Sequence, residues 1–285
     1  MKDALTATGA AARDLLRKPG ALALCALLYF ALLGSVYLFL GTKESTVPRL
    51  VLSAALALAA PLLFFLLQAA AVHFAPAEGL RPLLRRALRD FWKLLLVSIP
   101  LVALGLLVAY LLNKLQARFP INETTTAAST LPYPRTSPPA PVHWQAFVFP
   151  ALRLLLLGVV LPLLCVQLWI ALAHEGFKAT LKKLHRVAGR ALSPRSVLIY
   201  AAGLLTFVVI PYVLVFTRTQ VSGAWAELLV FGFRLLLAFL FTLCGWLVTV
   251  GALTRLGLAT VALGNMEPHD LPPRGEGLEE LRMES

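Results

Sequence analysis

The sequence is poor in charged residues and in cysteine, and each shortage excludes a class of protein. Only 14% of the 285 residues are charged and 59% are hydrophobic, whereas soluble domains carry about 25% charged residues. Cys25, Cys165 and Cys244 all lie inside apolar runs, without the spacing of a disulfide framework or a metal site. The composition therefore excludes a soluble globular domain and a disulfide-stabilised secreted domain.

The sequence also lacks the short motifs of common enzymes. It contains no GxxxxGK[ST] loop, no GxGxxG loop and no GxSxG turn, which cradle phosphates, bind dinucleotides and present a nucleophilic serine, respectively. His174 and Glu175 are not followed by the second histidine of an HExxH zinc helix. We therefore expect no enzymatic activity, no cofactor and no metal site.

In place of charge, the sequence has six long apolar runs, and its mean hydropathy is +0.80. Runs of this length are candidate membrane spans. At about 1.5 Å of rise per residue, each helix is long enough to cross a hydrocarbon core of about 30 Å. We predict an all-α, polytopic membrane protein with six transmembrane helices, over residues 21–41, 50–73, 94–112, 148–173, 197–217 and 227–250.

The basic residues lie mostly on one side of this predicted arrangement. Of the 26 Lys and Arg residues, 18 fall in the N-terminus, in segments 74–93 and 174–196, and beyond residue 250. The positive-inside rule then places both termini in the cytoplasm, at a bacterial inner membrane. Attraction to anionic lipid accounts for the net charge of +12, so we expect membrane lipids, and not nucleic acid, as partners.

The chain contains an internal repeat. Residues 61–89 recur without a gap as residues 162–190, with eleven of the 29 aligned positions identical. Both copies cross the membrane in the same direction, so we predict two parallel helix–amphipathic helix–helix repeats, over 50–112 and 148–217. The outer loop between them, 113–147, is rich in proline and predicted to be disordered. The transmembrane domain is predicted to cover 1–265, and a cytoplasmic tail to cover 266–285.

Each repeat contains a basic amphipathic stretch at the predicted cytoplasmic surface. Apolar residues at helical spacing form one face, such as Leu80, Leu83 and Leu88 in the first copy, and Leu181 and Leu184 in the second. Such helices lie in the membrane interface with their basic face toward anionic headgroups. They serve either as topological anchors or as a docking surface for a lipid headgroup or a protein partner. The candidate binding residues are Arg81, Arg85, Arg86, Arg89, Lys178, Lys182, Lys183, Arg186 and Arg190.

Six polar residues within the apolar runs or at their ends are further candidates. His73 and His174 end the first helix of each repeat. Because a metal site needs three or four ligands, we interpret this pair as interfacial hydrogen-bonding residues, with a catalytic pair as the alternative. Arg153 and Arg234 either extend to the outer headgroups or bind an anion. The six candidates are Gln68, His73, Gln167, His174, Arg153 and Arg234.

Tryptophan marks the predicted ends of the spans. Trp92, Trp169 and Trp246 fall near cytoplasmic ends, and Trp144 and Trp225 near outer ends. Tryptophan prefers the headgroup level because its ring is apolar while its N–H needs a polar partner. All five are predicted to lie in two interfacial belts.

Two stretches carry a resemblance to known proteins. One is RKPG at residues 17–20, before the first span, and the other is LRDFWK at residues 88–93, at the end of the first basic stretch. Together with the hydropathy pattern, they make the chain similar to bacterial six-helix membrane families that include the membrane domain accompanying some glycerophosphodiester phosphodiesterases. The resemblance implies an architecture. It implies no catalytic residue, because the phosphodiesterase domain has no counterpart here.

Three functions are compatible with these patterns. The first, which we favour, is a non-enzymatic module that organises lipid or a membrane or cytoplasmic protein partner through its basic helices. The second is a transporter or permease subunit for a lipidic or small anionic solute, which requires a cavity at the seam between the repeats. The third is an intramembrane enzyme built around His73 and His174. The patterns do not specify an oligomeric state.

Overall fold

The computed structural model describes residues 2–42, 46–76, 79–119, 145–217 and 223–265. Within these ranges 94% of residues are helical and none lies in a strand. Two segments, η3 and η4, are π-helical. In chain order the elements are α1 (Lys2–Arg17), α2 (Pro19–Gly41), α3 (Val47–Phe74), α4 (Leu80–Ala117), α5 (Gln145–Arg153), η3 (Leu154–Val160), α6 (Leu161–Glu175), α7 (Phe177–Lys182), α8 (Leu184–Ala191), α9 (Pro194–Leu204), η4 (Leu205–Val209), α10 (Ile210–Phe216) and α11 (Ala224–Asn265).

Six helical stretches in the described part of the chain are long and apolar enough to cross a membrane. Each contains or closely matches one predicted apolar run, so the predicted all-α, six-span fold is confirmed. The predicted tail 266–285, and residues 120–144 of the predicted outer loop, lie outside the described residues. The six stretches are Pro19–Gly41, Val47–Phe74, Leu80–Ala117, Phe147–Glu175, Pro194–Phe216 and Ala224–Leu258.

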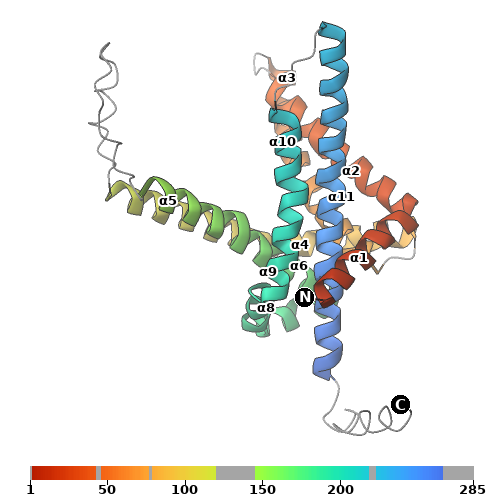
Figure 1. The fold of residues 1–285 in the computed structure, drawn as a ribbon, viewed down its shortest axis with the longest axis vertical. Helices are drawn as coiled ribbons and strands as arrows, with labels where there is room; N and C mark the ends of the chain where they lie inside the picture. The colour runs from red at the N-terminus through yellow and green to blue at the C-terminus, as the bar shows by residue number, and fades with distance from the viewer. Residues whose placement is uncertain (1, 43–45, 77–78, 120–144, 218–222, 266–285) are drawn as a thin grey trace, which may run out of the picture.

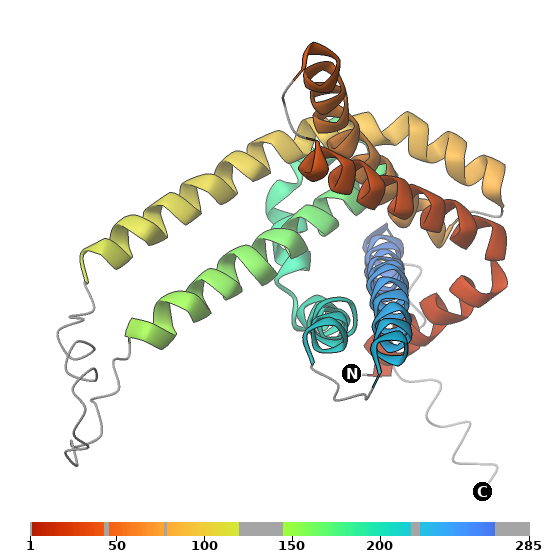
Figure 2. The ribbon, with the colours of Figure 1, turned by 90° about the horizontal axis from the view of Figure 1, so that it is seen from above.

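The six stretches pair into three helical hairpins that diverge from a common region. α2 pairs with α3, α4 pairs with the run α5–η3–α6, and the run α9–η4–α10 pairs with α11. Figure 2 looks along α10 and α11, which are seen end on, whereas α4 and the α5–α6 run lie across the view. The hairpins therefore point in different directions and do not form a parallel bundle.

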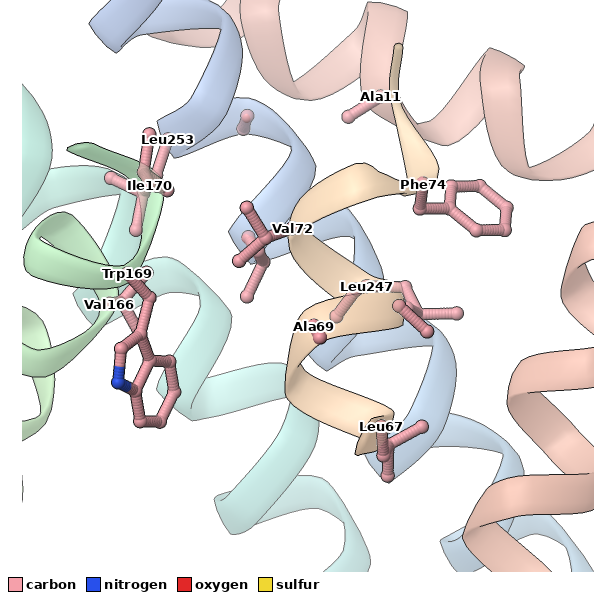
Figure 3. Packing of buried hydrophobic residues seen from close by; sticks show 14 of the residues in the cluster. Ala11, Leu67, Ala69, Val72, Phe74, Val166, Trp169, Ile170, Leu247 and Leu253 are labelled. Carbon is pink, nitrogen blue, oxygen red and sulfur yellow. The ribbon is translucent and has the colours of Figure 1, made fainter. Parts of the chain in front are cut away.

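The buried core lies where the three hairpins meet, and we call this region the hub. It is formed by residues 67–74 of α3, 163–172 of α6 and 243–254 of α11, joined by the buried faces of α1 and α4. Figure 3 shows this part of α3 next to α11, with Trp169 of α6 on its other side. Away from the hub, η3, η4 and α10 contain no buried residue. Their apolar side chains are left for lipid, because lipid tails solvate them as well as protein does.

The first basic stretch differs from the prediction because it is not a separate interfacial helix. It forms the start of α4, which continues without a break from Leu80 to Ala117, past the predicted end at residue 112. Pro82 lies in the first turn, where proline is tolerated, and no proline or glycine follows before Pro100, so one helix forms. In the second copy, Gly176 adopts φ 80° and ends α6, and Ser193 and Pro194 start α9. The second basic stretch is therefore separated from the spans on both sides, and it forms the short helices α7 and α8.

Proline also affects the two copies differently. Pro61 and Pro100 lie inside the uninterrupted helices α3 and α4. In the second copy, Pro162 and Pro211 each follow a π-helical segment, η3 or η4. Proline removes an N–H and its ring crowds the preceding turn, and a wider π-turn relieves that crowding.

The N-terminal helix α1 packs on α11 at the hub. Ala4 and Ala11 are buried in this contact, and Arg255 of α11 forms an ion pair with Asp14. The Lys18 ammonium donates to the carbonyl of Ala75 at 2.6 Å, just beyond the end of α3, where a positive charge is favoured. These contacts attach the amphipathic N-terminus to the second and last spans.

Candidate functional site: a central cavity and the polar groups around it

A cavity of about 430 Å³ lies where the helices begin to diverge from the hub. Side chains from α2, α3, α4, α6, η4 and α11 line it, so both copies of the repeat contribute to its wall. This volume is in the range of small-molecule and lipid pockets. The lining residues are Tyr29, Leu32, Phe64, Phe65, Leu67, Gln68, Ser98, Val102, Pro162, Cys165, Val166, Trp169, Phe207, Thr242, Leu243 and Trp246.

The polar groups in the cavity wall are mostly engaged with one another. The indole N–H of Trp246 donates to Gln68 Oε1 at 2.8 Å, and that of Trp169 donates to Ser98 Oγ at 3.0 Å. The hydroxyl of Thr242 donates to the carbonyl of Ala238 within α11. Among these groups in the described structure, the amide nitrogen of Gln68 has no hydrogen-bond partner. The cavity therefore presents a mostly apolar surface, to which the Gln68 amide and the Tyr29 hydroxyl contribute polar groups.

Aromatic rings hold this wall in shape. Phe64 and Phe65 of α3 meet Trp169 of α6 edge-on, with ring centroids 6.5 and 6.3 Å apart. Phe207 meets Trp246 in the same way at 5.3 Å. Edge-to-face pairs are each worth about 0.5–1.5 kcal/mol beyond the area they bury. The two ring clusters therefore link the first copy to the second, and the second copy to the last span.

The prediction that all tryptophans occupy interfacial belts is wrong for Trp169. Its side chain is only 6% exposed, and it lines the cavity. Trp246 is half-buried and lines the same cavity. Their N–H groups find partners in Ser98 and Gln68 inside the protein, so they do not need the headgroup layer. Trp92 and Trp225 are exposed, as predicted, and Trp144 lies outside the described residues.

The structure brings the two predicted histidines together at the hub. The rings of His73 and His174 lie 6.4 Å apart and edge-on. His73 Nε2 is 3.0 Å from Asp90 Oδ2. Lys93 donates to the other carboxylate oxygen at 2.6 Å, and Arg89 lies 3.4 Å from Oδ2. Since His73 is engaged by this buried carboxylate, the geometry favours a structural role for it.

Asp90 is the central residue of this cluster, and the sequence analysis missed its role. Its side chain is only 1% exposed. The signal was its spacing, because Asp90 shares the buried face of α4 with Leu83, Ala87 and Leu94. A lone acid on an apolar face predicts a buried partner. That the partner is His73, on a different helix, does not follow from spacing alone.

The two predicted glutamines lie at different sites. Gln68 lines the central cavity, whereas Gln167 lines a second cavity at the hub, beside the start of α9. The two predicted arginines within spans lie far from both, near the hairpin tips. Arg153 donates to Asn113 Oδ1 at 2.5 Å, and Arg234 donates to the carbonyl of Thr217 at 2.5 Å. Both guanidiniums are bound by nearby polar groups of the neighbouring helix of their hairpin.

The predicted basic residues lie on the surface, with one exception. Arg190 is half-buried and donates to Glu175 at 3.1 Å. Within the predicted apolar stripes, Leu80, Leu88, Leu181 and Leu184 are exposed on the surface of the protein. Helical contacts bury positions 83, 87 and 90 in the first copy and 180, 187 and 191 in the second. The exposed residues are Arg81, Arg85, Arg86, Arg89, Lys178, Lys182, Lys183 and Arg186.

Neither metal ligands nor relatives identify this site. The described residues contain no group of three or more His, Cys, Asp or Glu side chains suited to a metal ion. The resemblance to six-helix families remains a prediction, because nothing further tests it. No family model, no curated protein and no solved structure matches this chain.

Proposed function

We propose that this protein is a non-enzymatic, lipid-binding module of the bacterial inner membrane. Its central cavity takes the acyl chain of a lipid, and the basic residues around the hub hold the anionic headgroup. The observation that carries this proposal is the cavity of about 430 Å³ with an almost entirely apolar wall, placed among six helices that suit a membrane. An apolar ligand gains by entering such a wall, and the membrane supplies acyl chains at high concentration.

The position of the basic residues supports the headgroup contact. Ser98 in the cavity wall follows Arg89 by nine residues on the same helix, which corresponds to about 13 Å at a rise of 1.5 Å per residue. This distance fits a lipid whose phosphate lies at the basic surface and whose chain extends into the cavity. The charge asymmetry of the sequence supports placing this surface at the cytoplasmic leaflet.

The exposed leucines support the same membrane contact. Leu80 and Leu88 are 43% and 50% exposed, on the part of α4 that also presents Arg85 and Arg89. A surface with leucine beside arginine suits the membrane interface, because leucine enters the acyl boundary while arginine reaches the phosphates. The amide nitrogen of Gln68 is then available to donate to an ester carbonyl of a lipid in the cavity.

The two half-buried cysteines allow a matched test of the cavity. Cys165 lines the cavity, whereas Cys244 is half-buried outside it. Each full-length variant, Cys165→Phe and Cys244→Phe, is purified in mild detergent after loading with phosphatidylglycerol. Mass spectrometry then measures the lipid retained per protein. We expect Cys165→Phe to retain several-fold less lipid, because its ring fills the cavity, and Cys244→Phe to match the wild type. Equal retention by the two variants would overturn the cavity as the lipid site.

The headgroup contact is tested separately. Replacing Arg81, Arg85 and Arg86 together with Gln removes three exposed charges without changing the cavity. Each basic residue near an anionic surface contributes about 1 kcal/mol to binding, so binding to phosphatidylglycerol vesicles falls strongly. Binding to neutral phosphatidylcholine vesicles is expected to stay unchanged. A variant that binds both vesicles like the wild type would show that these residues do not contact headgroups.

A second candidate function is movement of a lipid between leaflets. The observation that favours it is the place of the cavity at the seam, with walls from α3 and α4 of the first copy and α6 and η4 of the second. Relative motion of two repeats about such a seam is a common route of transport. Proteoliposomes carrying a fluorescent phospholipid distinguish the functions, since a transporter accelerates its exchange between leaflets and a static binding module does not.

A further inference from the structure

A second cavity, of about 350 Å³, lies at the hub between α6, α8, α9 and α11. Its polar wall comes from Gln167 of α6, Arg190 of α8, and Ser193, Arg195 and Ser196 around the start of α9. Residues of α11 complete the wall on the other side. This cavity shares no lining residue with the central one, and the inference drawn from it does not rest on the proposed lipid function.

The wall of this cavity is rich in hydrogen-bond donors. Two guanidiniums, from Arg190 and Arg195, face it together with two serine hydroxyls that lie 3.0 Å apart. The α9 helix starts at the cavity with Pro194, which has no N–H, in its first turn, and Ser193 Oγ accepts a hydrogen bond from the N–H of Ser196 there. Among the described residues, no Asp or Glu lines this cavity. Glu175 accepts from Arg190 at 3.1 Å and lines an adjoining, much narrower pocket that shares Gln167, Arg190 and Gly257 with this cavity.

Gln167 is the most informative residue of the wall. It is only 4% exposed, and its single hydrogen bond in the described structure is a long one, from Nε2 to Ser196 Oγ at 3.5 Å. Its amide oxygen has no partner there. Buried amides are normally well satisfied, and a partly satisfied one suggests a missing partner. The amide therefore has capacity to bind a ligand in the cavity.

In the described part of the first copy, the positions that match this cavity wall differ in residue type and in local structure. Position 167 corresponds to Leu66, and Arg190 corresponds to Arg89, whose side chain is 70% exposed and directed to Asp90. The helix start at α9 is also missing from the first copy, because α4 runs unbroken through the matching positions. The second copy therefore has a polar, basic cavity at positions where the first copy has Leu66 and an exposed arginine.

We propose that the second cavity binds the phosphate group of a phosphate ester. Guanidinium groups match phosphate oxygens with paired, charge-assisted hydrogen bonds, and the start of a helix favours an anion. Arg190 and Arg195 hold the phosphate oxygens, while the serine hydroxyls and the Gln167 amide bind the remaining oxygens or a neighbouring hydroxyl of the ester. The phosphate belongs either to a lipid headgroup or to a soluble ester, because both present the same chemistry.

The test measures binding to the purified, full-length protein in neutral detergent by calorimetric titration. The two probes are inorganic phosphate and a short-chain phosphatidic acid. We expect the wild type to bind at least one probe, and Arg195→Gln and Gln167→Leu each to weaken that binding about tenfold, the effect of losing one charge-assisted bond. The change to leucine places at position 167 the residue that the first copy carries. Lys114→Gln and Arg118→Gln remove exposed basic charges at and just after the end of α4, outside both cavities, and are expected to bind like the wild type.

The outcomes separate the two sources of phosphate. Binding of phosphatidic acid alone assigns the site to a lipid headgroup, whereas equal binding of inorganic phosphate assigns it to a soluble ester. Thermal unfolding of each variant shows that it is folded, and Gln167→Leu provides the test if Arg195→Gln does not fold. The proposal is overturned if the wild type binds neither probe, or if the cavity variants bind as tightly as the two control variants. Lipid retention in the central cavity is measured separately, by comparing Cys165→Phe with Cys244→Phe.

Discussion

The contact between Gly203 and α11 gives the sharpest prediction about how this fold is held together. A Cβ atom placed on Gly203 would lie 2.8 Å from Cγ2 and 3.0 Å from Cβ of Thr249. Thr249 is itself only 3% exposed, and its hydroxyl donates to the carbonyl of Gly245 at 2.6 Å. Its side chain cannot turn away without breaking that bond. Gly203→Ala must therefore push α9 away from α11.

The size of the effect follows from two opposing contributions. Overpacking a close contact costs about 1–3 kcal/mol, while replacing glycine by alanine inside a helix gains up to about 1 kcal/mol. The packing cost exceeds the helix gain here because the branched, hydrogen-bonded side chain of Thr249 occupies the space that the new methyl group needs. We expect a net loss of about 1–2 kcal/mol of unfolding free energy for Gly203→Ala.

The assay is thermal unfolding in detergent, followed by tryptophan fluorescence. Gly34→Ala and Gly232→Ala are matched controls, because a Cβ at either position meets no atom within 4 Å. Both are expected to unfold at or above the wild-type temperature, and Gly203→Ala several degrees below it. Adding Thr249→Ala to Gly203→Ala should recover part of the loss, since the crowding atoms are then removed. If Gly203→Ala were as stable as the controls, the close approach of α9 and α11 would be refuted.

Two further predictions concern the polar contacts at the hub. Asp90→Ala removes the partner of the buried His73 and is expected to cost about 1–3 kcal/mol in unfolding free energy. Arg89→Gln changes a side chain that is 70% exposed, so it is expected to alter the unfolding free energy by less than about 0.5 kcal/mol. Equal unfolding temperatures for the two variants would contradict the buried pair. Ser98→Ala leaves the Trp169 indole N–H without its acceptor and costs about 1 kcal/mol, with a change in tryptophan emission as the second readout. An unchanged emission spectrum for Ser98→Ala would show that the Trp169 bond does not form.

The helices were predictable because their signals are local. Apolar runs of sufficient length report membrane spans directly, and the described bounds of α2 and α3 lie within three residues of the predicted runs. The break at Ser193 and Pro194 is also local, since serine caps and proline starts a helix. The unbroken α4 was missed because the basic residues at 81–89 were interpreted as an interfacial helix of their own. Charge shows where a helix surface faces, and it does not show where the helix ends.

The polar site was predictable only in part, because the spacing of residues along one helix does not show which residues of other helices they contact. The repeat identified His73 and His174 as a pair, and the structure places them in contact. Their partner Asp90 and the separate positions of Gln68 and Gln167 depend on how helices rotate against one another. A rotation of one position along a helix moves a side chain by about 100°, from a cavity wall to the lipid.

The sequence by itself determined that the chain is an all-helical protein with six membrane-length helices, because length and hydropathy act within each segment. It also showed the similarity between residues 61–89 and 162–190 and the concentration of basic residues in a few segments. Only the tertiary structure decided that three hairpins diverge from one hub and leave an apolar cavity between them. It also decided that a second cavity, lined by Arg190 and Arg195, lies in one copy of the repeat, while Asp90 after the other copy pairs with His73. These features depend on which side chains meet across helices, and contacts of that kind carry no signature within any single stretch of sequence.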